Sequence, residues 1–177
     1  RSDLSSDWEC FDWNESEFPP SNKVFEVMKS FYRYERYPDI TAKELKIKLS
    51  GYVSLPTQFI EVYNGSDDAL KDIITVFVDK GTHVLSYQPS YTQVNTFITT
   101  NTDKYMKINI LDPLGEHSYN FNLCAGADVV YLVNPNNPTG KLLEVDKIEE
   151  LVKTYPDVLF IVDEAYYEFA KMSCCHL

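Results

Sequence analysis

The spacing of hydrophobic positions predicts three helices in the first half of the chain. The first follows Ser21, a residue type that caps helix N-termini. Its apolar face is formed by Val24, Val27, Met28 and Phe31. The second is expected to begin at Thr41, because Thr41 and Glu44 have the spacing of a capping box. The third is amphipathic and is expected to end at Gly81, and its apolar face is formed by Leu70, Ile73, Ile74 and Phe77.

Short apolar runs predict strands between these and two further helices. A short strand is expected at residues 59–63, directly before Asn64. Four more are expected at residues 84–87, 105–110, 129–133 and 158–162, with helices at residues 91–99 and 145–154 between them. The last two strands are nearly all apolar, as in strands that are covered on both faces. This alternation predicts an α/β fold, a three-layer α/β/α sandwich around a mostly parallel sheet.

The last residues bear on how the chain is organised. Residues 171–177 follow the final predicted strand after one short turn, and no closing element comes after them. Doubly wound sheets usually continue further. We therefore expect the chain to be a fragment of a larger protein.

Composition narrows the classes of function. The net charge of −11 over 177 residues disfavours nucleic acid and anionic membranes as partners. We find neither a secretory leader nor an apolar run long enough to span a bilayer. The four cysteines show no metal-ligand spacing, which predicts reduced thiols, a cytoplasmic protein and no metal site.

Polar clusters follow the ends of the predicted strands, at residues 64–68, 89–91, 134–140 and 163–166. In open parallel sheets ligands bind beyond the carboxyl ends of the strands. We therefore expect these clusters to converge on one crevice.

Two of the clusters suit a planar, phosphate-bearing ligand. Ser66 and Asp67 begin a helix, whose free N–H groups and dipole favour a phosphate, although plain N-capping explains them as well. Tyr91 follows a strand, so its ring could lie flat over a ligand or simply pack in the interior.

The other two clusters carry an amide and a carboxylate. Asn137 lies in a turn so rich in proline and asparagine that its dihedrals are nearly fixed. Asp163 ends an apolar strand, where its carboxylate needs a cationic partner such as a protonated ring nitrogen, or caps the following turn. Tyr166 comes three residues later, within reach of the same ligand.

These motifs resemble those of a known family. Asn-Pro-Asn-Asn-Pro-Thr-Gly at residues 134–140, followed by Asp-Glu-Ala-Tyr at 163–166, resembles the paired signature of class I/II, fold-type I, pyridoxal-phosphate-dependent aminotransferases. Arg-Tyr-Pro-Asp at 36–39, Asn-Gly-Ser-Asp at 64–67 and the segment at 13–19 are similar to the histidinol-phosphate aminotransferase branch. The resemblance extends from about residue 12 to residue 169.

The resemblance implies a cofactor, pyridoxal 5'-phosphate, and a role for each matched residue. Gly65, Ser66 and Asp67 would hold the phosphate, and Tyr91 would stack on the ring. Asn137 and Tyr166 would bind the ring's 3-oxygen. Asp163 would pair with the ring nitrogen. Small amino and keto compounds would be the substrates.

The resemblance also bears on the N-terminal region. Residues 1–39 would form an N-terminal arm and part of a small domain, and residues 40–177 the cofactor-binding large domain, incomplete at its C-terminal end. Tyr37 would reach the phosphate in a partner's site, which implies a homodimer, and Asn14 would line the substrate pocket. Phe18 replaces a tyrosine that often binds a substrate phosphate in this branch, so we expect weak discrimination for phosphorylated substrates.

The expected activity is the transfer of an amino group between an amino acid and a keto acid or aldehyde. The Schiff-base lysine of the family lies in a Ser-x-x-Lys segment well beyond the Asp-Glu-Ala-Tyr strand, and this chain has none there. Lys171 is too close to Asp163 to be that lysine, so no catalytic lysine is assigned and the fragment alone is expected to be inactive. Two alternatives share these motifs: a decarboxylase of the threonine-phosphate type, and a non-catalytic scaffold.

Overall fold

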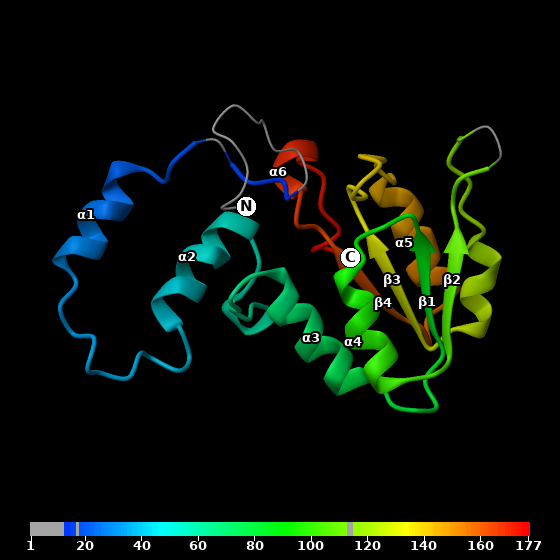
Figure 1. The fold of residues 1–177 in the computed structure, drawn as a ribbon, viewed down its shortest axis with the longest axis horizontal. Coiled ribbons are helices and arrows are strands. Elements are labelled where there is room, and N and C mark those ends of the chain that lie inside the picture. The colour runs from blue at the N-terminus through cyan, green and yellow to red at the C-terminus, as the bar shows by residue number, and fades with distance from the viewer. Residues whose placement is uncertain (1–12, 17, 113–114) are drawn as a thin grey trace, which may run out of the picture. The chain divides into compact units, whose positions relative to one another are not determined.

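The computed structural model describes residues 13–16, 18–112 and 115–177 (Figure 1). The chain divides into two compact units, Arg1–Ala42 and Lys43–Leu177. The boundary expected from the sequence falls after residue 39, and its assignment to an arm and a small domain remains a prediction. Within the described residues, no helix combines the length and the apolar content needed to cross a bilayer.

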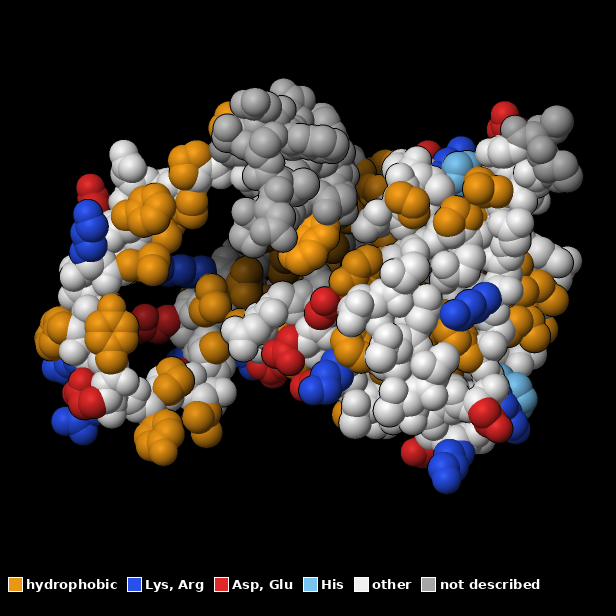
Figure 2. Space-filling view, viewed as in Figure 1, with side chains coloured by type: hydrophobic (Ala, Val, Ile, Leu, Met, Phe, Trp, Pro, Cys, Tyr) orange, Lys and Arg blue, Asp and Glu red, His pale blue; other side chains and the backbone are white. Residues whose placement is uncertain are grey.

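The first unit contains helix α1, Asn22–Ser30. Its predicted cap is confirmed, because the Ser21 side chain accepts a hydrogen bond from the Lys23 N–H at 3.3 Å. None of its residues is buried. The apolar side chains of this helix therefore lie on the surface, as Figure 2 shows over α1.

Helix α2, Lys43–Val53, begins later than predicted. The Thr41 hydroxyl donates to the Asp39 carboxylate at 2.7 Å, and the Thr41 N–H donates to the same oxygen. The prediction of a helix start and capping box at Thr41 is wrong, because Ala42 has φ of +44°, outside the helical region, and the helix begins only at Lys43. Short polar side chains often bond locally in this way in place of capping a helix.

All four strands of the sheet are parallel. They are β1 Val84–Gln88, β2 Tyr105–Asn109, β3 Val129–Val133 and β4 Leu159–Asp163, in the order β2-β1-β3-β4. These strands and the parallel sheet were predicted from the sequence and are confirmed. Every residue of β3 is buried, whereas β4 has only Ile161 buried.

Helices cover both faces of the sheet, which confirms the three-layer arrangement (Figure 1). Helices α3, Ser66–Phe77, and α4, Gln93–Asn101, pack Ile74 and Ile98 against β1 and β3 on one face. The opposite face is covered by the 3₁₀ helix η2, Phe121–Gly126, and by residues at the end of α5, Val145–Thr154. A short helix α6, Tyr167–Ala170, follows β4.

Two further predictions are wrong. Residues 59–63 form no strand: a 3₁₀ helix η1, Thr57–Phe59, precedes an irregular segment. A strand needs a neighbour for its backbone groups, and none of the four strands pairs with this segment. Helix α3 ends at Phe77 instead of continuing to Gly81, since Asp79 and Thr82 form a turn, with the Thr82 N–H donating to the Asp79 carbonyl at 2.9 Å.

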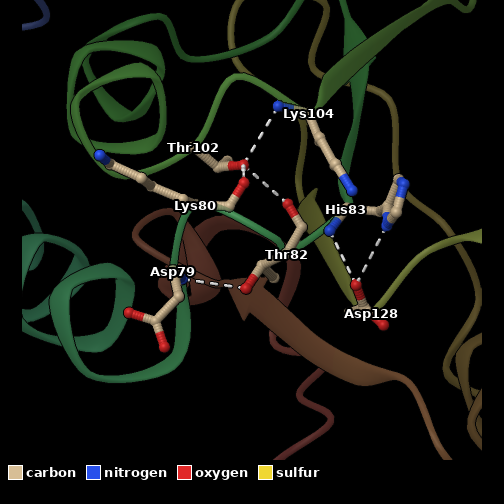
Figure 3. Close-up of polar contacts among 7 residues, drawn as sticks. All are labelled: Asp79, Lys80, Thr82, His83, Thr102, Lys104 and Asp128. Atoms are coloured by element: carbon tan, nitrogen blue, oxygen red, sulfur yellow. Dashed lines mark hydrogen bonds and ion pairs between the residues drawn. The ribbon is translucent and has the colours of Figure 1, made fainter.

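The N-terminal ends of the strands are tied together by structural hydrogen bonds (Figure 3). The hydroxyl of Thr102, which is 3% exposed, contacts the carbonyls of Lys80 at 3.3 Å and Thr82 at 2.9 Å. Nearby, the Asp128 carboxylate accepts the His83 N–H at 2.7 Å, which helps to lower the pKa of Asp128. The polar side chains at this end of the sheet hold the strands together, and none of the predicted site residues lies here.

We expect Thr102→Val to lower the free energy of unfolding by about 1 kcal/mol, because it removes the buried hydroxyl that contacts two carbonyls. Urea denaturation measures the loss. Thr100→Val is the matched control, since the Thr100 hydroxyl is exposed and bonds only within α4, to the Thr96 carbonyl. Equal losses in the two variants would contradict the importance of the Thr102 contacts.

Candidate functional site

The candidate site lies at the carboxyl ends of the strands. The loop at residues 89–91 follows β1, residues 134–140 follow β3, and Asp163 is the last residue of β4. Residues at alternate positions of a strand share a face, so Asp163 lies on the face that contains Ile161 and is covered by α3 and α4. Three of the four clusters predicted to converge therefore belong to one end of one sheet, whereas the cluster at residues 64–68 follows no strand and leads into α3.

The start of α3 provides unpaired backbone donors. Gly65 has φ of +90°, a backbone conformation that side chains disfavour, and it turns the chain into the helix. The N–H groups of Ser66, Asp67 and Asp68 have no acceptor among the described residues. The Asp68 carboxylate accepts the Asn64 N–H at 3.3 Å. Helix N-termini of this kind attract anions.

Tyr91 connects this helix to the loop after β1. Its hydroxyl donates to the Asp67 carboxylate at 2.7 Å. Burial, together with that hydrogen bond and the charge of Asp67, raises the pKa of Tyr91 to about 12, and smaller contributions come from Asp163 and Tyr166. Four of the predicted residues are thus close enough to interact.

Each oxygen of the Asp163 carboxylate accepts one hydrogen bond. Oδ1 accepts the Ala165 N–H at 3.0 Å, and Oδ2 accepts the Tyr131 hydroxyl at 2.8 Å. Sequence reasoning missed Tyr131, because a tyrosine within an apolar strand resembles an ordinary core residue. The one available signal was a hydroxyl in a run of aliphatic residues that must find a partner.

Asn136, with 4% of its surface exposed, joins the two loops. Its side-chain oxygen accepts the Ser90 hydroxyl at 2.8 Å. Its amide nitrogen donates to the Pro89 carbonyl at 3.0 Å and to the Thr139 hydroxyl at 2.8 Å. The loop after β3 is thereby fixed to the loop that carries Tyr91, a contact that sequence reasoning also missed.

Asn137 lies next in the same loop and is partly exposed. Its side-chain amide makes no hydrogen bond to any residue that the structure describes, so the amide can take a ligand. Tyr166 is partly buried and lies at the N-cap position of α6.

The remaining two predicted residues belong to the other unit. Tyr37 is 98% exposed, and Asn14 has φ of +52°. Both lie in Arg1–Ala42. Their predicted roles stay predictions.

Two cavities flank the sheet. One of about 310 Å³ lies beside the start of α3, lined by Asn64, Asp67, Asp68, Lys71 and Phe97. Another, of about 570 Å³, is at the opposite end of the strands and is lined by residues such as His83, Lys104 and Met106. Because the larger cavity has a mostly apolar lining and none of the predicted site residues, we place the candidate site at the carboxyl ends.

Comparison with known proteins decides the family. Residues 6–176 match the family model of aminotransferase class I and II. The chain belongs to this family. It is 34% identical over 180 residues to the dihydroxyacetone phosphate transaminase of Campylobacter jejuni, covering 94% of this chain and 47% of that protein. It is 31% identical to the histidinol-phosphate aminotransferase of Corynebacterium diphtheriae, covering 89% of this chain and 47% of that one.

The fold agrees with this assignment. The structure of histidinol-phosphate aminotransferase from Sinorhizobium meliloti in complex with pyridoxal-5'-phosphate matches with a TM-score of 0.78 and 24% identity, over 88% of this chain and 44% of that one. The chain spans about half the length of the curated relatives it matches.

We expect Asn136→Ala to lower the free energy of unfolding by about 3 kcal/mol, because the buried Ser90 hydroxyl and Pro89 carbonyl lose their partner. Ser90→Ala should cost about 1 kcal/mol, since it removes a single bond. Asn122→Ala, at an exposed asparagine, is the control and should stay within about 0.5 kcal/mol of the parent. Urea denaturation measures the free energy of unfolding of the three variants. An equal loss in Asn136→Ala and Asn122→Ala would contradict the importance of the Asn136 contacts.

Asp67→Asn should lower the pKa of Tyr91 from about 12 toward its ordinary value of 10.0. The sign follows because an anionic neighbour disfavours the phenolate and a neutral amide does not. The tyrosine ring signal, assigned with Tyr91→Phe, can be followed by NMR as the pH is raised. Asp68→Asn is the matched control, since its carboxylate bonds Asn64; a drop of the same size there would argue against the Asp67 contact.

Proposed function

We propose that the protein containing this chain is a pyridoxal-phosphate-dependent aminotransferase, which moves an amino group between an amino acid and a keto acid or aldehyde. The observation that carries the proposal is the Asp163 carboxylate. It ends β4 at the ligand-binding end of the sheet, with a donor on each oxygen and Tyr91 nearby, in a chain of the aminotransferase family.

The residues present fit pyridoxal phosphate. The phosphate requires an anion site, and the unpaired N–H groups at the start of α3 and the Ser66 hydroxyl provide one. The Asp67 carboxylate is engaged by Tyr91, so the anion site is left to the backbone donors. The free amide of Asn137 and the phenol of Tyr166 suit the ring's 3-oxygen.

Asp163 would pair with the nitrogen of the bound ring. When bound, the cofactor accepts electrons from a substrate that loses its α-proton, provided that this nitrogen stays protonated. Asp163 would hold that proton by its charge, and its two donors would keep the carboxylate oriented. No residue of the chain is assigned the covalent bond to the cofactor or the transfer of the α-proton.

For the substrate, we propose a small compound with a phosphate group. Support comes from the names of two relatives, which refer to dihydroxyacetone phosphate and histidinol phosphate. The expectation from Phe18 is the opposite, namely weak discrimination for phosphorylated substrates. Comparing kcat/KM for phosphorylated and unphosphorylated forms of one substrate decides between them.

A homodimer and a cytoplasmic location complete the proposal. The apolar residues of α1, such as Val27 and Met28, are 66% and 62% exposed, as on a surface that a partner covers. Cys124, Cys174 and Cys175 are free thiols, which suits a reducing compartment.

The proposal is tested with the whole protein. Asp163→Asn should keep the fold and lower kcat on the order of 1,000-fold, because a neutral amide cannot hold the ring nitrogen protonated. The measurement is amino transfer with pyridoxal phosphate added. Asp157→Asn makes the same change of charge at an exposed position before β4 and should leave kcat unchanged.

The other outcomes identify the alternatives. Release of CO2 without a keto product would favour the decarboxylase. Failure of the whole protein to bind pyridoxal phosphate would favour the scaffold. Near-normal turnover by Asp163→Asn would contradict the role of Asp163.

A further inference from the structure

The Asp163 carboxylate accepts hydrogen bonds from two directions. The Ala165 N–H approaches Oδ1 from the loop that follows β4. The Tyr131 hydroxyl approaches Oδ2 from β3, the neighbouring strand. A carboxylate oxygen accepts about two hydrogen bonds, so each oxygen keeps capacity for a ligand.

Strand register explains how Tyr131 reaches the carboxylate. Tyr131 pairs with Ile161, and Val133 pairs with Asp163. Tyr131 therefore lies two positions deeper in the sheet, on the same face as Asp163. Its hydroxyl comes from the interior, so it does not occupy the mouth of the site.

Tyr131 is itself fixed in place and stays a donor. The side chain is 1% exposed and packs in the core between the sheet and helices α3 and α4. Burial first, and the Asp163 charge second, raise the pKa of Tyr131 far above its ordinary range. The phenol thus remains protonated at any physiological pH and keeps its hydrogen to donate to Asp163.

We propose that Tyr131 is a positioning residue, which holds the Asp163 carboxylate in the orientation that receives a protonated ring nitrogen. This inference rests on the proposed function. Its structural basis is the hydrogen bond of 2.8 Å between a fully buried side chain and the carboxylate at the end of the neighbouring strand. Without that bond, one oxygen of the carboxylate has no protein donor among the described residues.

The test compares two ligands of the whole apo-protein: pyridoxal phosphate, and deazapyridoxal phosphate, in which a C–H replaces the ring nitrogen. Tyr131→Phe should weaken binding of pyridoxal phosphate about tenfold, as expected for the loss of a hydrogen bond to a charged group. Binding of the deaza ligand should not change. In an Asp163→Asn background, Tyr131→Phe should cause no further loss.

Tyr105→Phe is the matched control. The Tyr105 hydroxyl is also partly buried on this face, but it bonds Ser86 and Asn95 and does not touch Asp163. This variant should weaken neither ligand. Equal weakening of both ligands by Tyr131→Phe, or none, would overturn the proposal, since a general packing defect does not distinguish the ligands.

A second measurement needs no substitution. The hydroxyl proton resonance of Tyr131 in the native protein should shift when pyridoxal phosphate binds and should not shift with the deaza ligand. Identical responses would count against the proposal. If the native protein binds both ligands equally well, the pairing of Asp163 with a ring nitrogen fails, and the proposed function loses its main support as well.

Discussion

Parallel pairing in register is the constraint on which the site depends. Each strand runs in the same direction, so the loops that follow β1, β3 and β4 emerge at one edge. The pairing of Val133 with Asp163 brings the loop at residues 134–140 beside the carboxylate. The sheet, and no single motif, brings the polar loops after β1, β3 and β4 together. The helices on its two faces supply the apolar burial that keeps the strands aligned.

Strand register alone does not fix the conformation of the loops that follow the strands. Hydrogen bonds from buried polar side chains fix it. Asn134 exchanges two hydrogen bonds with Leu143, which closes the loop at both ends. Asn136 fixes the same loop to Pro89 and Ser90. Buried polar groups are costly unless every donor and acceptor is paired, so these asparagines tolerate few alternative loop positions. Asn137 follows Asn136 in this loop, and its side-chain amide bonds none of the described residues, whereas its neighbour carries the structural bonds.

Local sequence patterns predicted most of the features that depend on neighbours along the chain. The helix after Ser21, the all-apolar strand β3 and the polar residues at strand ends follow from spacing and composition, and the structure has them. Errors arose where a partner distant in sequence decides. Residues 59–63 have the composition of a strand but no strand beside them. Tyr131 was missed for the same reason: its role depends on Asp163, 32 positions away. The error at Thr41 is different, because its partner Asp39 lies only two residues away.

The charges of the site give its two carboxylates different roles. After burial, Asp67 and then Asp163 contribute to the raised pKa of Tyr91, so both carboxylates lie near its phenol. Asp67 lies in the first turn of α3, and its carboxylate accepts the Tyr91 hydroxyl. Asp163 has donors on both oxygens but forms no ion pair with any residue that the structure describes, and a carboxylate in that position gains most from a positively charged ring. A ligand with a phosphate at one end and a protonated nitrogen at the other would match this arrangement, because the backbone N–H groups of α3 would take the anion and Asp163 would take the cation.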